Sequence, residues 1–360
     1  MLRKSLLSLC LLSLFVGSRT GLEAQGSPDL HVVVNLVQLN VAVTDRKGNY
    51  ITGLRPKDFS IVEDGITEKV ATFAEGNEPA VSLIDPARPR GDAEVKGASA
   101  GTTPVTLDSL MAGANVFVLF DTSNYMYRGF VFAQDAIAEF IRSLGTADKI
   151  AFYSYSRDLS RAAPLTADRT QVLHAVRSTV AGDEAALYNT LLLTLNDATQ
   201  YKGRKVVVVF SNGPDNSSVV PPEDVAEFAQ SAGVSIYMIS TQDAKIEPLS
   251  TAVFDRMTAA TGGKAYFSKN WRDEKRAFAS VRDDLAHLYS LSYYPKANPN
   301  SGWRAINVKL IGDHAKGYKI RTRNGYRPQP SRFSSEAQPD RLDLTPPNSY
   351  ALSAPAGNSK

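Results

Sequence analysis

One aspartate and one serine stand where an α/β fold often places its chemistry. Residues 116–120 form an apolar run, and Asp121 and Ser123 follow it directly in the segment FDTSNYM. Open α/β sheets build ligand sites at the carboxyl ends of their strands, which is where such a run would end. A carboxylate and a hydroxyl are the oxygen donors that hard cations prefer. The spacing therefore predicts a ligand or cation site at Asp121 and Ser123.

Other residues that could carry out catalysis form no recognisable constellation. None of the histidines has a metal-ligand spacing such as HExxH, and Ser123 lacks the glycine-framed turn of a hydrolase nucleophile. No glycine-rich phosphate loop of the Walker type is present. The histidines are His31 on an expected strand, His174 and His287 on expected helices, and His314 in an expected turn. We expect core or surface histidines, loop serines and no enzymatic activity.

The first residues have the pattern of an export signal. Arg3 and Lys4 give a basic start, and residues 6–16 form an apolar run too short to span a bilayer. Leu22-Glu23-Ala24 is a passable cleavage site, with Val16-Gly17-Ser18 as the competing one. We expect a cleaved signal peptide over residues 1–24 and a secreted or periplasmic protein.

Composition narrows the range of partners. The chain has 40 basic and 37 acidic residues and a net charge of +3. Loss of residues 1–24 removes three basic and one acidic residue and leaves +1, which is no electrostatic footprint for nucleic acid. The only cysteine, Cys10, leaves with that segment, so the mature chain has no disulfide. We expect no transmembrane segment in the mature protein, because no later stretch is apolar for long enough.

Residues 30–77 predict a small β-module. Residues 31–43 change from a β-branched run to apolar alternation, which indicates a long strand. Residues 58–73 predict a hairpin around the Asp-Gly pair at 64–65, a pair suited to a tight turn. We expect the acids Asp58, Glu63 and Asp64 to serve as turn residues.

The centre of the chain predicts an α/β domain. Residues 78–114 have the Pro, Gly and Ser composition of a flexible linker. In residues 115–288, five strand-like runs alternate with helical patterns, which predicts a Rossmann-like, doubly wound and mostly parallel sheet. Residues 289–328 return to alternating extended segments and are expected to complete one antiparallel β-module with residues 30–77. The tail, 329–360, has a composition typical of disorder.

Three segments of the chain resemble the loops of a von Willebrand factor type A (VWA) domain. FVLFDTSNYM, DEAALYNTLLLTL and RKVVVVFSNGPDNSS match those loops in order and spacing. The flanks VTDRKGNYITGLRPKDFSIVEDG, LYSLSYYPKANPNSGWRAINVKL and KIRTRNGY resemble the VWFA-related family of secreted proteins common in Acidobacteria. The resemblance covers about residues 30–328 and implies the VWA fold.

The resemblance also implies a metal-ion-dependent adhesion site (MIDAS) at the carboxyl edge of the sheet. Metal-binding members hold a divalent cation with Asp-x-Ser-x-Ser, a threonine and an aspartate from three loops. Asp121 and Ser123 match two of these ligands, whereas Tyr125, Ala185 and Asn212 replace the other three. The site is therefore expected to be degenerate, with no cofactor. Weak Mg²⁺ binding at Asp121 and Ser123 is the alternative.

Nearby acids leave a further alternative open. Asp183 and Glu184 lie near the second loop and Asp215 lies beside the third, so they could replace missing ligands or remain solvent-exposed loop acids. Asp121 itself could serve as a cap for the backbone that follows it.

Three functions are consistent with the sequence. The first is an extracytoplasmic, non-enzymatic binding or adhesion module that recognises an unknown protein or cell-surface ligand. The second is a structural scaffold of the cell envelope, and the third is a hydrolase of unknown type. We favour the first, with Tyr127 as additional aromatic surface. The expected ligand-binding residues are Asp121, Ser123, Asn124, Tyr125, Ala185 and Asn212.

Overall fold

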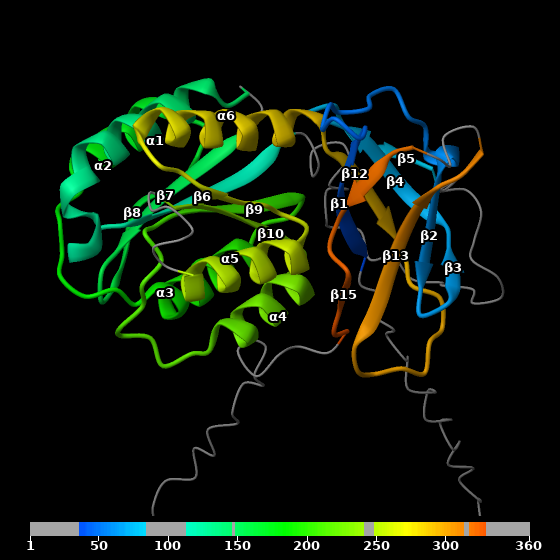
Figure 1. The fold of residues 1–360 in the computed structure, drawn as a ribbon. Coiled ribbons are helices and arrows are strands. Elements are labelled where there is room, and N and C mark those ends of the chain that lie inside the picture. Colours follow the sequence, from blue (N-terminus) through cyan, green and yellow to red (C-terminus); the bar gives the residue numbers. More distant parts are fainter. Residues whose placement is uncertain (1–35, 84–112, 146–147, 241–247, 313–316, 329–360) are drawn as a thin grey trace, which may run out of the picture. The chain divides into compact units, whose positions relative to one another are not determined.

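The computed structural model describes residues 36–83, 113–145, 148–240, 248–312 and 317–328. The expected signal peptide, most of the expected linker and the expected tail lie outside these residues. The described chain forms an α/β domain and two antiparallel sheets (Figure 1). This confirms the fold class expected from the sequence. Within the described residues, no helix combines the length and apolar character needed to cross a bilayer.

A six-stranded sheet forms the centre of the α/β domain. Its strand order is β11-β10-β9-β6-β7-β8, and all neighbours are parallel except β7 and β8. The strands are β6 (Ala114–Asp121), β7 (Lys149–Tyr155), β8 (Leu159–Thr166), β9 (Arg204–Phe210), β10 (Val234–Ser240) and β11 (Ala265–Phe267). The central strands β6, β9 and β10 are almost wholly buried, as expected for parallel strands covered on both faces.

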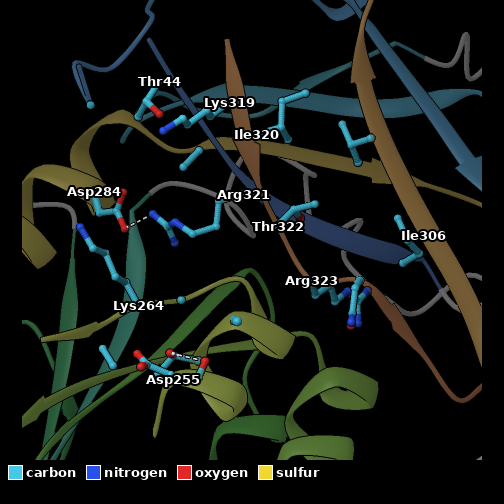
Figure 2. A pocket seen from close by; sticks show the side chains of 18 of the residues that line it. Thr44, Asp255, Lys264, Asp284, Ile306, Lys319, Ile320, Arg321, Thr322 and Arg323 are labelled. Atoms are coloured by element: carbon cyan, nitrogen blue, oxygen red, sulfur yellow. Dashed lines mark hydrogen bonds and ion pairs between the residues drawn. The ribbon is translucent and has the colours of Figure 1, made fainter. Parts of the chain in front are cut away.

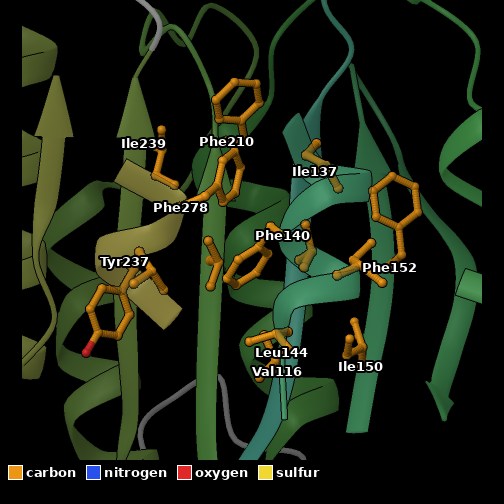
Figure 3. Close-up of a cluster of buried hydrophobic side chains, with 14 of the residues drawn as sticks. Val116, Ile137, Phe140, Leu144, Ile150, Phe152, Phe210, Tyr237, Ile239 and Phe278 are labelled. Atoms are coloured by element: carbon orange, nitrogen blue, oxygen red, sulfur yellow. The ribbon is translucent and has the colours of Figure 1, made fainter. Parts of the chain in front are cut away.

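Helices cover both faces of this sheet. They are α1 (Phe130–Ser143), α2 (Arg169–Arg177), α3 (Leu187–Thr199), α4 (Pro222–Ala232), α5 (Pro248–Thr261) and α6 (Trp271–His287), with the 3₁₀ helix η3 (Asn124–Gly129) before α1. On one face, α1 and α6 bring Phe140 and Phe278 together, with ring centroids 5.0 Å apart (Figure 3). On the other face, α3 and α4 bury Leu191 and Phe228. The two cores hold the strand ends in fixed positions.

The sequence predicts five strands for this sheet, and β8 is not one of them. Most of its side chains are exposed or half-buried, and it contains Pro164. Proline is tolerated at sheet edges, and a mostly exposed edge strand has no reason to show apolar alternation. Periodicity therefore misses this strand, which pairs antiparallel with β7.

The two antiparallel sheets combine both ends of the chain. One has the order β14-β1-β12-β4-β5 and the other β15-β13-β2-β3. The first contains β1 (Val37–Thr44), β4 (Val70–Glu75), β5 (Val81–Ser82), β12 (Tyr289–Tyr293) and β14 (Lys319–Arg321). The second contains β2 (Phe59–Glu63), β3 (Ile66–Glu68), β13 (Arg304–Leu310) and β15 (Gly325–Tyr326), with the 3₁₀ helix η1 (Pro56–Asp58) before β2. Their inner faces share one core around Leu39, Ile61 and Leu291.

The expected hairpin over residues 58–73 is shorter than predicted. Asp64 and Gly65 have positive φ angles of 47° and 83° and join β2 to β3, but β4 then belongs to the other sheet. Glu63 is wrongly expected to be a turn acid. It is 1% exposed and accepts a hydrogen bond from the Tyr293 hydroxyl at 2.6 Å. The two-residue period from Phe59 places it on the inward face.

A buried carboxylate connects β14 with the α/β domain. Asp284 of α6 is fully buried and accepts hydrogen bonds from the hydroxyls of Tyr50 and Tyr237, each at 2.7 Å. It also forms an ion pair with Arg321 of β14 (Figure 2). These residues belong to one compact unit, and Asp284 and Arg321 border a cavity of about 770 Å³.

Candidate functional site

Asp121 ends strand β6 and is fully buried. One carboxylate oxygen accepts the backbone N–H of Ser123 at 2.9 Å, and the other accepts the Ser211 hydroxyl at 2.7 Å. The Tyr155 hydroxyl lies 3.2 Å from Ser211 Oγ and extends this network. Burial raises the pKa of the Asp121 carboxyl, while the hydrogen bonds act in the opposite direction. Asp121 is thus part of an interior polar network.

Two oxygens beside this network have no partner. Ser123 precedes η3 as its N-cap residue, yet its hydroxyl makes no capping bond. Within the described residues, Ser123 Oγ and Asn212 Oδ1 are buried without a hydrogen-bond partner. The Asn212 Nδ2 donates to the backbone carbonyl of Tyr125 at 2.5 Å. The third loop is therefore tied to the first by the residue at the expected aspartate position.

The second loop is closed in the same way. Ala185 is fully buried, and its backbone N–H donates to Asn216 Oδ1 at 2.9 Å. The acids near these loops are also engaged. Asp183 accepts the Tyr127 hydroxyl at 2.9 Å, Glu184 pairs with Arg157 at 2.6 Å, and Asp215 accepts the backbone N–H of Tyr188 at 3.0 Å. Through these bonds, the three acids hold the loops and the start of α3 in place.

A family model for the von Willebrand factor type A domain matches residues 115–279, from β6 into α6. Residues 115–279 are a VWA domain. The match and the parallel sheet with helices on both faces agree on this point. A search of curated proteins gives no match.

Solved structures with a similar fold include three from bacteria. The vWF domain of the type V pili tip protein Mfa5 from Porphyromonas gingivalis has a TM-score of 0.43 and 12% identity, over 49% of this chain and 96% of that one. BatB from Bacteroides thetaiotaomicron has a TM-score of 0.40 and 14% identity, over 48% and 97% of the two chains. A von Willebrand factor type A protein from Catenulispora acidiphila has a TM-score of 0.40 and 12% identity, over 62% and 68%.

The donor set in this VWA domain does not fit tight binding of a divalent cation. It consists of the Asp121 carboxylate, Ser123 Oγ and Asn212 Oδ1. Both oxygens of the carboxylate already accept hydrogen bonds from the protein. Position 185 supplies only a methyl group, and the Tyr125 side chain reaches solvent. Among the residues that the structure describes, no group of three or more His, Cys, Asp and Glu could hold a metal ion. Mg²⁺ favours near-octahedral coordination by oxygens that are free to bind it.

The expected ligand-binding residues are only partly accessible. Asp121, Ser123, Ala185 and Asn212 are buried, so only Asn124 and Tyr125 of the six could touch a large ligand. The physical reason is that the three loops bond to one another above the strand ends. For example, Asn124 N–H donates to the Asp183 carbonyl at 2.9 Å.

Apolar side chains are exposed beside these closed loops. Tyr127 of η3 is 49% exposed, and Val131 and Phe132 at the start of α1 are 64% and 60% exposed. Sequence analysis missed Val131 and Phe132, although they fall outside the helical register that buries Ile137 and Phe140. Other exposed apolar residues on loops at this edge or at the start of α5 are Val180, Val219 and Leu249.

Proposed function

We propose that this chain is an extracytoplasmic, non-enzymatic binding module that recognises a protein through the carboxyl edge of its VWA sheet, without a tightly bound cation. The observation that carries this proposal is the exposed apolar surface of Tyr125, Tyr127, Val131 and Phe132, which we call the η3–α1 surface. These four residues fall within eight consecutive positions of the chain, and exposed apolar patches on soluble domains are frequent interaction sites. The export pattern of residues 1–24 supports the extracytoplasmic part.

The η3–α1 surface has the chemistry of a protein contact. Tyrosine and other aromatic side chains are enriched among the residues that dominate binding energy at protein interfaces. The surface is also held in place, because the Tyr127 hydroxyl shares its proton between the Gly182 carbonyl at 2.8 Å and the Asp183 carboxylate at 2.9 Å. The Asn212 side chain fixes the Tyr125 carbonyl in turn. A preformed surface loses less conformational freedom on binding.

The closed Asp121 network supports recognition that does not need a cation. In a cation-dependent site, a partner's acid completes the shell of an accessible metal. Here Asp121 is buried, and the acids nearest to it have protein partners. Direct contact through apolar side chains remains the better supported mode.

The test is capture of partners from envelope extract with the purified chain as bait. Wild type is compared with the double variant Tyr127→Ser, Phe132→Ser and with the control Leu193→Ser, which removes an exposed apolar side chain from α3. We expect the double variant to lose at least about tenfold in captured protein, because interface aromatics often contribute about 2 kcal/mol each. Capture that is equal for all three proteins would contradict the proposal.

A further inference from the structure

A second polar cavity lies within the VWA domain, beside β7, β8 and α2. Its volume is about 630 Å³, which falls in the range of roughly 300–1,000 Å³ that small-molecule sites occupy. Ser154 and Ser160 line it from the two strands, and Asp158 lines it from the turn that joins them. Gln171 and His174 line it from α2, three residues apart and therefore on one helix face. The η3–α1 surface contributes none of these side chains.

The serine hydroxyls in this cavity are available to a ligand. Ser154 and Ser160 are directly paired across β7 and β8, so their side chains lie next to each other on one face of the sheet. Ser154 is only 7% exposed. Ser160 is exposed, and Ser154 Oγ is not among the buried side-chain oxygens that lack a partner. Both hydroxyls therefore reach the solvent in the cavity, where a ligand could replace water as their hydrogen-bond partner.

Other hydroxyls in the same wall are already engaged. Thr122 donates to the Tyr155 carbonyl at 2.8 Å, Ser178 to the His174 carbonyl at 2.9 Å, and Thr179 to the Ala175 carbonyl at 2.9 Å. The polar side chains that remain are Ser154, Ser156, Asp158 and Ser160 on the strand side and Gln171 and His174 on α2. The cavity therefore has two walls with unused hydrogen-bonding capacity.

The lining chemistry selects a class of ligand. No lysine or arginine lines the cavity, and the Asp158 carboxylate repels a phosphate or carboxylate ligand, so His174 is the one lining side chain that could attract an anion, in its protonated form. Its apolar lining is mostly alanine, with Val180 at the exposed end, which provides little surface for a lipid or an aromatic ring. Hydroxyl, carboxylate and amide groups together can both donate and accept. That combination matches a neutral ligand rich in hydroxyl groups.

We propose that this cavity binds a neutral saccharide through Ser154, Ser160, Asp158 and Gln171. The serines and the glutamine amide exchange hydrogen bonds with sugar hydroxyls, and the Asp158 carboxylate accepts from a pair of them. This inference goes beyond the proposed protein recognition, since it concerns different residues and a different ligand.

The test is calorimetric titration of the purified chain with glucose, galactose, mannose, N-acetylglucosamine, maltose and cellobiose. We expect at least one of these sugars to bind. Asp158→Asn and Gln171→Ala should each weaken its binding by about tenfold, the loss that follows from one charge-assisted or neutral hydrogen bond left unmade. Ala162→Trp should abolish binding by filling the cavity from an exposed position on β8.

Two controls make the result decisive. Ser280→Ala removes an exposed serine hydroxyl on α6, outside the cavity, and should leave sugar binding unchanged. The single variant Phe132→Ser, whose exposed side chain does not line the cavity, should also bind sugar normally while its protein capture weakens. No binding by any sugar overturns the proposal, and so does binding that survives Asp158→Asn, Gln171→Ala and Ala162→Trp.

Discussion

Ser211 donates a hydrogen bond to the Asp121 carboxylate across 2.7 Å, which joins the loops after two neighbouring parallel strands. The backbone N–H of Ser123 satisfies the other carboxylate oxygen. The acid that heads the cation site in metal-binding VWA domains is here held by protein donors. This relationship leads to the first two predictions.

Asp121→Asn should stabilise the protein at neutral pH. Burial raises the pKa of Asp121 above its ordinary value of 3.8, so the folded state holds the proton more tightly than the unfolded state. The protonated Asp121 carboxyl therefore contributes its full stabilisation at pH values below the ordinary pKa. This stabilisation is lost as the pH rises through the raised pKa of the folded state. In the variant, the amide oxygen can accept from the Ser123 N–H while the amide N–H donates to Ser211 Oγ, which reverses the bond that the carboxylate accepts. Thermal unfolding from acidic to neutral pH should show a smaller decline for the variant, whereas a lower melting temperature at pH 7 would contradict this reading.

The triple change Tyr125→Ser, Ala185→Thr, Asn212→Asp should create a response to Mg²⁺ that the wild type lacks. It adds two hydroxyls and places a second carboxylate near Asp121. The two carboxylates repel each other, and a bound cation would relieve that repulsion. Asn212→Asp also removes the donor to the Tyr125 carbonyl, so the variant should melt below wild type in EDTA. Thermal shift assays with Mg²⁺, Mn²⁺ and Ca²⁺ measure both effects. A clear wild-type shift that Asp121→Ala abolishes would show that the native site binds a cation.

Asp284→Ala should destabilise the fold by about 3–5 kcal/mol, because it leaves Arg321 without its buried partner. Tyr50 and Tyr237 lose their acceptor in the same change. The matched control is Asp283→Ala, which removes a half-exposed ion pair with Arg282 and should cost no more than about 1 kcal/mol. Urea unfolding compares the two variants. Equal losses would mean that the buried network contributes little.

A chain that ends at Leu288 should aggregate. Strand β12 lies between β1 and β4 in the five-stranded sheet, so its loss exposes two long strand edges and the core around Leu39. Sizing and light scattering of the truncated and complete chains provide the measurement. A truncated chain as soluble and as stable as the complete one would refute the dependence of the N-terminal strands on β12.

Sequence patterns predict the strands that are buried on both faces. The run before Asp121 and the run VVVVF are apolar throughout, and the structure places both in the centre of the parallel sheet. Strand β8 was missed because its exposure pattern has no period of two. Glu63 was misread because its charge argues for a turn, whereas its register places it inside, beside Tyr293 and Arg304.

The candidate site was less predictable than the fold. Loop similarity identifies Asp121, Ser123 and Asn212, but it contains no information on how far the loops cover them. Burial depends on contacts such as the one between Asn212 and Tyr125, which join residues far apart in sequence. Ser154 and Ser160 form a pair only through the register of β7 with the unpredicted β8.

The central claim is that this VWA domain recognises its partner through the η3–α1 surface without a cation. The most direct measurement is the affinity of a captured envelope protein for the purified chain, determined in EDTA and in excess Mg²⁺. We predict the same affinity in both conditions for wild type and a loss of at least about tenfold for Tyr127→Ser, Phe132→Ser. Binding that requires Mg²⁺, or that is unchanged in the double variant, would contradict the account.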